Sequence, residues 1–247
     1  DFLGLRTLTV IRNALQFIGE GRGETDFSID DIPLDDAATY ELLARGQTDG
    51  VFQLESSGMK DLLIRMKPDS IEDIIALISL YRPGPMKYAD DFIAQKQGKK
   101  QIVYEDPRLE PILKETYGIP LYQEQVMQIA GVIGGFTMAD ADNLRRAMSK
   151  KKIDAMERES SKFIAGAKKN GIPEQKAKKL WEQMETFSGY GFNKSHSAAY
   201  TMISFQTAYL KAHYPVEFMT ALLTSEKNTR DNIVKYMASC REMGINV

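Results

Sequence analysis

Cysteine and histidine are scarce in this chain of 247 residues. Cys240 is the single cysteine, which excludes an internal disulfide and fits a reducing compartment. With only His196 and His213 beside it as nitrogen or sulfur ligands, a structural zinc site is not expected. A signal segment and apolar runs of membrane-span length are also missing, so we expect a cytoplasmic protein that does not bind membranes.

Hydrophobic residues are plentiful, and at 43% they suffice for a sizeable core in one large or two small domains. The chain contains no internal repeat and no low-complexity segment. It begins with Asp1 and runs directly into an apolar segment, which we interpret as the interior of a longer protein.

The spacing of the apolar residues predicts a mostly α-helical fold with a few short strands. A glycine-rich turn is expected at 19–23, after the first helix. Short strands are expected at 50–54 and 101–104. Helices are predicted at 7–18, from Asp35 or Asp36 to before Gly46, at 57–66, from Ser70 to before Pro83, near 90–97, at 122–133, from Thr137 through an arginine pair, at 152–169, from Pro173, and from about Ser197, Pro215 and Thr229.

The segment 189–200 carries the densest set of chemically useful side chains, in a loop that opens onto a helix. A helix start with free N–H groups attracts anions, so this loop could bind a nucleotide. The alternative is a capped helix start with solvated polar groups. Phosphate and sugar could be contacted by three polar residues, Asn193, Lys194 and His196. A flat face for a base could come from Tyr190 or Phe192. The helix that follows could be capped by Ser195 or Ser197.

A second cluster is basic, in a chain whose net charge is only −2. Arg145 and Arg146 are adjacent, and guanidinium forks suit bidentate phosphate binding. For these two residues we favour binding of a polyphosphate over a solvated helix end. Lys150, Lys151 and Lys152 follow, and these could equally decorate a solvated helix end, where cations favour the helix dipole.

Two further charged residues have an interpretation from their position alone. Arg82 follows an apolar helix and precedes a proline-rich turn, where it could complement the helix dipole or contact nucleic acid. Glu124 stands at a helix start, so we interpret it as a dipole partner and not as a catalytic acid.

Six ordered motifs resemble one family, the catalytic alpha subunits of bacterial DNA polymerase III, which are C-family polymerases. They are spread along the chain from residue 1 to residue 200. The motifs are DFLGLRTLT at 1–9, GVFQLES at 50–56, YRPGPM at 81–86, YQEQVM at 122–127, LRRAM at 144–148 and GFNKSHSAAY at 191–200.

The resemblance implies a role for each matching residue. Asp1 matches one of three palm aspartates that hold two Mg²⁺ ions, and the other two are absent. Arg145 and Arg146 match arginines that hold the incoming triphosphate. A further group, Phe192, Asn193, Lys194 and His196, matches the segment that lines its sugar and base. Arg82 matches a position near the template, and Lys150 to Lys152 are expected to contact DNA.

The resemblance also implies a domain organisation and a function. Residues 1–20 would end the palm and 21–247 would form the fingers domain, with a subdivision near 100–120. The intact subunit would bind a deoxynucleoside triphosphate and primer–template DNA, and would reach the sliding clamp and replisome through its remaining domains. Two-metal phosphoryl transfer needs the missing aspartates, so this chain alone is expected to be inactive. The alternative is a helical module that binds nucleotides, nucleic acid or a protein without chemistry of its own.

Overall fold

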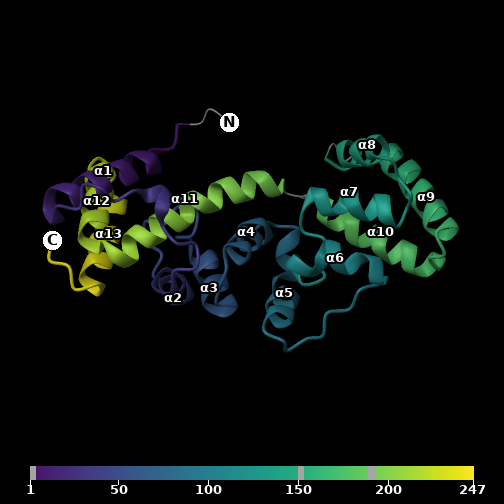
Figure 1. The fold of residues 1–247 in the computed structure, drawn as a ribbon, viewed down its shortest axis with the longest axis horizontal. Helices are drawn as coiled ribbons and strands as arrows, with labels where there is room; N and C mark the ends of the chain where they lie inside the picture. Colours follow the sequence, from purple (N-terminus) through teal and green to yellow (C-terminus); the bar gives the residue numbers. More distant parts are fainter. Residues whose placement is uncertain (1–3, 150–152, 189–192) are drawn as a thin grey trace. The chain divides into compact units, whose positions relative to one another are not determined.

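The computed structural model describes residues 4–149, 153–188 and 193–247. Within these residues the chain forms thirteen α-helices and four short 3₁₀ helices, and no strand element is present there (Figure 1). The prediction of a mostly α-helical fold is confirmed.

The two predicted short strands are wrong. Residues 50–54 form successive tight turns, in which Val51 N donates to Thr48 O at 3.0 Å and Leu54 N to Val51 O at 3.1 Å. Residues 101–104 are irregular. A strand needs a neighbour to pair its backbone N–H and C=O groups, and the described part of the chain offers none, so these groups are satisfied by turns or left to solvent.

The first helix is longer than its apolar pattern predicts. Helix α1 (Arg6–Arg22) continues through Gly19 and Gly21, and it ends only at Gly23, which adopts a left-handed φ of 74°. The predicted turn at 19–23 is therefore confined to its last residue. Packing of α1 against α12 supports this extra turn, because tertiary contact overrides the low helix propensity of glycine.

The contacts divide the chain into two compact units. Unit 1 comprises Asp1–Ile74 and Ala199–Val247, and unit 2 comprises Ile75–Ala198. The division falls inside α4 (Ile71–Leu80) and inside α11 (Lys194–His213). The assignment of 1–20 to the end of a palm and of 21–247 to a fingers domain remains a prediction.

Unit 1 is built on the packing of α1 against α12, with α13 beside α12 and α2 beside α3. Ile18, Leu210 and Phe218 are fully buried in its core. Apart from α1 and its parts of α4 and α11, its elements are a 3₁₀ helix at Ile29–Asp31, α2 (Ala37–Ala44), α3 (Ser57–Met66), α12 (Pro215–Ser225) and α13 (Arg230–Glu242).

Unit 2 packs α7 to α10 around a core that contains Phe163 and Trp181, whose ring centroids lie 5.7 Å apart. Backbones approach closely here, since a Cβ added to Gly166 would lie 1.9 Å from Gly134 O. Its α-helices beyond the parts of α4 and α11 are α5 (Ala89–Lys96), α6 (Glu110–Leu113), α7 (Gln123–Val132), α8 (Met138–Ser149), α9 (Ile153–Lys169) and α10 (Glu174–Ser188). Its 3₁₀ helices are Pro85–Tyr88, Pro107–Leu109 and Lys114–Thr116.

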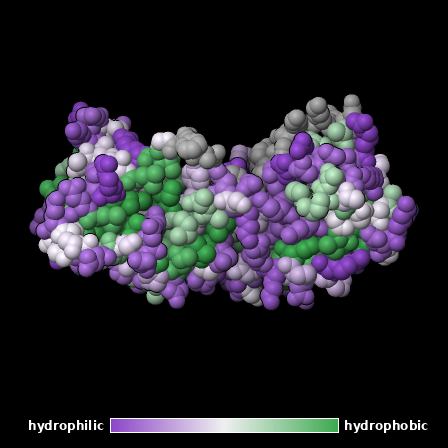
Figure 2. All heavy atoms as spheres, turned by 45° about the horizontal axis from the view of Figure 1, so that its top comes forward, coloured by the Kyte–Doolittle hydropathy of each residue, from purple (hydrophilic) through white to green (hydrophobic). Residues whose placement is uncertain are grey.

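Figure 2 shows hydrophilic side chains interspersed with hydrophobic patches on the visible face. Among the residues that the structure describes, no helix combines the length and the apolar character that a membrane span requires.

Candidate functional site

Helix α8 begins with a reciprocal cap between Thr137 and Asp140. Thr137 Oγ1 accepts from Asp140 N at 3.2 Å, and Asp140 Oδ2 accepts from Thr137 N at 3.2 Å. The hydrogen bond from Lys162, together with those from Thr137, lowers the pKa of the Asp140 carboxyl to about 2. The cap fixes the start of the helix and thereby the places of Arg145 and Arg146 two turns later.

Arg145 and Arg146 share one carboxylate, that of Asp142. Arg145 donates from Nε and Nη2 to Asp142 Oδ1, at 3.0 and 2.7 Å, and Arg146 Nε lies 2.8 Å from Asp142 Oδ2. Asp142 precedes the arginines by three and four residues, the two spacings that meet on one face of a helix. The hydrogen bond from Arg145 and the charge of Arg146 hold the pKa of Asp142 below its usual value.

Helix α11 begins at Lys194, and Asn193 is the residue that caps it. Asn193 Oδ1 accepts from His196 N at 3.0 Å. The predicted caps Ser195 and Ser197 are wrong, because both lie inside the helix. Ser197 is fully buried, and its Oγ lies 2.8 Å from Ser79 Oγ. Asparagine competes with serine for the cap position, and here it occupies the place just before the first helical turn.

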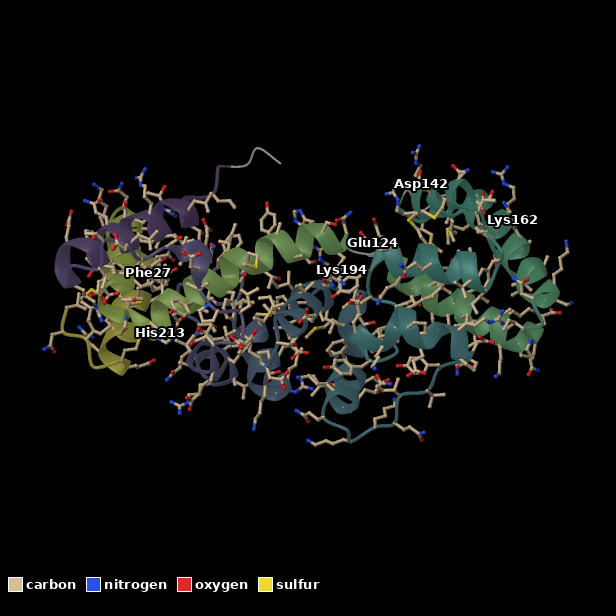
Figure 3. The ribbon with its side chains drawn as sticks, viewed as in Figure 1. Phe27, Glu124, Asp142, Lys162, Lys194 and His213 are labelled. Atoms are coloured by element: carbon tan, nitrogen blue, oxygen red, sulfur yellow. The ribbon has the colours of Figure 1, made fainter. Side chains whose placement is uncertain are left out.

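Lys194 is held at its backbone and at its side chain by two glutamates. Its N–H donates to both oxygens of Glu124, at 3.3 and 3.2 Å, and its Nζ lies 2.6 Å from Glu115 Oε2. The ammonium also lies 5.5 Å from the centroid of the Tyr122 ring. Figure 3 shows Lys194 and Glu124 side by side where α11 and α7 begin, and Asp142 on α8. Glu124 thus complements the positive ends of two helices, which extends its predicted role as a dipole partner.

The start of α7 is fixed by a buried amide. Gln125 Oε1 accepts from Leu121 N and Tyr122 N, at 2.9 and 3.0 Å, and its Nε2 donates to Thr116 Oγ1 at 2.9 Å and to Ile112 O at 3.1 Å. These bonds tie α7 to the segment that carries Glu115. The two acids around Lys194 are therefore positioned by one side chain.

Arg82 lies directly after α4 and is half-buried, which lowers the pKa of its guanidinium. Both interpretations of this residue, the dipole partner and the nucleic-acid contact, remain predictions. Other predicted site residues lie outside the described part of the chain: Asp1, Lys150, Lys151, Lys152, Tyr190 and Phe192.

The arginine pair and the Asn193–His196 segment belong to the same unit, and the contacts described for each tie it to carboxylates of that unit. The sequence analysis did not predict that Asp142 and Glu115 contact the cations of the site. The spacing of Asp142 to the arginines was a usable signal. Glu115 lies 79 residues from Lys194 in the sequence, so no local sequence pattern predicts that pair.

The model of the bacterial DNA polymerase III alpha subunit finger domain matches residues 7–171, more than half of the chain. The chain belongs to this family, which confirms the resemblance seen in its motifs.

Several curated relatives carry the name DNA polymerase III subunit alpha. The chain is 51% identical over 252 residues to that of Thermus aquaticus, with all of the chain and 21% of the relative covered. Identity to the Escherichia coli K12 protein is 51% over 257 residues, covering all of the chain and 22% of the relative. Identity to the Aquifex aeolicus protein is 52% over 239 residues, covering 95% of the chain and 20% of the relative. The chain spans about a fifth of the length of these relatives.

Proposed function

We propose that this chain is the nucleotide- and DNA-binding fingers portion of a bacterial replicative DNA polymerase that adds deoxynucleotides to a primer 3′ end. One observation carries the proposal beyond family membership. Arg145 and Arg146 gather their guanidinium groups around a single carboxylate on an exposed part of α8, and their side chains are 35% and 65% exposed.

A carboxylate and a phosphate present similar oxygen pairs to a guanidinium fork. The shortest distances from Asp142 to the two arginines, 2.7 Å to Arg145 Nη2 and 2.8 Å to Arg146 Nε, lie in the range of charge-assisted hydrogen bonds. Two positive charges held together suit a triphosphate, which carries several negative charges along its length. We therefore assign Arg145 and Arg146 to the phosphates of the incoming nucleotide.

The remaining assignments follow from the family and from the place of each residue. Phe192, Asn193, Lys194 and His196 would line the sugar and base, where a side chain can exclude a 2′-hydroxyl. Arg82 would lie near the template, and Lys150 to Lys152 would neutralise DNA phosphates, a contact that depends on salt. Residues 1–20 would end the palm, and the rest would form the fingers domain.

The chemistry is proposed for the intact subunit, as phosphoryl transfer with two Mg²⁺ ions. Among the described residues, no group of three or more His, Cys, Asp and Glu side chains is placed to hold a metal ion. The described residues by themselves therefore do not fit a two-metal site. Asp1 is the one proposed ligand in the chain. The other ligands, the sliding clamp and the replisome would be reached through the remaining parts of the subunit.

The alternative is a helical module that binds nucleotides, nucleic acid or an acidic protein without chemistry of its own. Titration of the chain with a deoxynucleoside triphosphate and Mg²⁺, beside an acidic peptide at matched salt, separates the protein-interaction module from the functions that bind a nucleotide. The proposal expects nucleotide binding that weakens when Arg145 and Arg146 are both replaced by glutamine.

The matched control is Arg158→Gln, which removes one exposed arginine from α9 of the same unit. It should leave nucleotide binding unchanged. If the acidic peptide binds as tightly as the nucleotide and the double variant loses both, the interaction module is the correct function.

A further inference from the structure

Asp142 contacts both arginines of the proposed triphosphate site, and its side chain is itself 32% exposed. We propose that Asp142 is a positioning residue that holds the two guanidinium groups ready for the triphosphate and stays in place when the nucleotide binds. This inference rests on the proposed function, because it assigns a role only if Arg145 and Arg146 bind phosphate.

Adjacent residues on an α-helix point in directions about 100° apart, so Arg145 and Arg146 do not converge by themselves. Their like charges also favour separation. Asp142 lies three residues before one arginine and four before the other, so its two oxygens can each receive one of them. Oδ1 accepts from Arg145 and Oδ2 contacts Arg146. One carboxylate thereby brings two diverging side chains together and offsets part of their repulsion.

The manner of contact leaves room for a ligand at Arg146. Asp142 Oδ2 lies 2.8 Å from Nε, at the inner end of the guanidinium, and 65% of the Arg146 side chain is exposed. Phosphate oxygens can approach the outer edge formed by Nη1 and Nη2 while Asp142 keeps its contact with Nε. A guanidinium has five N–H donors in a fixed fork, so one group can bind a carboxylate and a phosphate together.

A positioning acid and a competing acid have opposite effects on nucleotide binding. If Asp142 had to leave before the triphosphate could bind, its removal would free the arginines and lower the KM for the nucleotide. If Asp142 supports the arginines, its removal lets two long side chains spread over many rotamers, and the KM rises. The sign of the change decides between the two.

The test is primer extension by the intact subunit carrying Asp142→Asn, with KM and kcat measured for one correct deoxynucleotide at saturating DNA. We expect the KM to rise about three- to fivefold, as for the loss of one partly exposed ion pair, and kcat to change less. Asp142→Glu, which keeps the charge at the same helix position, should restore most of the loss.

Glu174→Gln is the matched control, because it removes a carboxylate of the same unit that pairs with Lys168 and Lys178 and not with the arginines. Its KM should equal that of the wild type, and circular dichroism of all variants reports whether the helices are intact. In a background that carries both Arg145→Lys and Arg146→Lys, Asp142→Asn should have no further effect, since the forks it supports are gone.

The two proposals fail in different ways. If the lysine variants alone leave the KM unchanged, the proposed triphosphate site is wrong. If they raise it while Asp142→Asn lowers it or leaves it unchanged, the site stands and the positioning role of Asp142 is overturned. An equal rise in Asp142→Asn and Glu174→Gln would show a general effect of losing a surface carboxylate, which also overturns it.

Discussion

At the scale of single residues, three cations of the proposed nucleotide site, Arg145, Arg146 and Lys194, are held by acids of the same unit. Asp142 engages the arginine pair, and Glu115 and Glu124 engage the side chain and the backbone of Lys194. Such pairing fixes side chains that would otherwise sample many rotamers, and it offsets part of the positive charge around each cation.

His196 is proposed to exclude the 2′-hydroxyl of a ribonucleotide. Its N–H is fixed by the Asn193 cap, at 3.0 Å, so its backbone does not depend on a ligand for its place. A ring held against the sugar rejects a 2′-hydroxyl by contact. His196→Ala in the intact polymerase should therefore raise ribonucleotide incorporation relative to deoxynucleotide incorporation, measured as the ratio of the two kcat/KM values. An unchanged ratio at unchanged stability would make His196 an ordinary helix-start residue.

Lys211 in unit 1 should make folding stability depend on pH. Its Nζ is buried and donates to Asp49 O at 2.7 Å, and burial lowers the pKa of the ammonium to about 8. The unfolded chain, where lysine has a pKa of about 10.4, binds more protons between these two pH values. The free energy of unfolding should therefore rise with pH across that window, by an amount on the order of 2 kcal/mol.

Lys211→Met should remove this rise, which denaturant unfolding at pH 8 and pH 10 would measure. Lys227→Met, which removes an exposed lysine of the same unit, is the control. The difference in the free energy of unfolding between the wild type and Lys211→Met should change between pH 8 and pH 10. An equal difference at the two pH values would refute the argument.

Single residues were predictable from the sequence where local density marks them. The arginine pair stands out because two adjacent guanidinium groups are unusual in a nearly neutral chain. Their acid partner could have been inferred from helical spacing, whereas Glu115 could not, because only the fold brings it to Lys194. The binding and catalytic roles assigned to all of these site residues, the arginine pair included, remain predictions.

At the scale of elements, the start of α11 depends on the start of α7. Glu124 Oε1 and Oε2 receive the N–H of Lys194, a donor without an intrahelical partner in the first turn. Glu124→Gln should weaken this contact by on the order of 1 kcal/mol, because a charged acceptor becomes a neutral one in a partly exposed place.

Hydrogen exchange of the amides at the start of α11 measures that loss. The control is Glu115→Gln, which breaks the ion pair with Lys194 Nζ but leaves the backbone contact. Faster exchange of the Lys194 amide in Glu124→Gln alone is the expected result. Equal exchange in both variants would show that the backbone contact does not hold the helix start.

Helices were predicted well because their ends carry chemistry that can be read locally. Asp36 caps α2, Ser56 caps α3, and the Thr137–Asp140 box opens α8. Extended segments were not predicted well, because a strand depends on a pairing partner that can lie far away in the sequence. The residues at 50–54 have the apolar content of a strand, yet Thr48 Oγ1 donates to Leu54 O at 2.6 Å and closes the segment into turns.

At the scale of the whole molecule, the chain spans about a fifth of its relatives' length, and Asp1 is the one metal ligand that the proposal assigns to it. Charge neutralisation at the transferring phosphate depends on both metal ions. The chain alone should therefore show no primer extension with Mg²⁺ and all four deoxynucleotides. Template-dependent extension above a control without enzyme would contradict this.

The account depends most on Arg145 and Arg146 binding the triphosphate as forks and not as point charges. The direct measurement is kcat/KM for a correct deoxynucleotide in the intact subunit carrying Arg145→Lys or Arg146→Lys, which keeps the charge and removes the bidentate geometry. We predict a loss of tenfold or more, mainly through KM, from about 1.5–3 kcal/mol of charged hydrogen bonding. Two lysine variants with the kcat/KM of the wild type would show that these arginines are surface residues, and the account would be wrong.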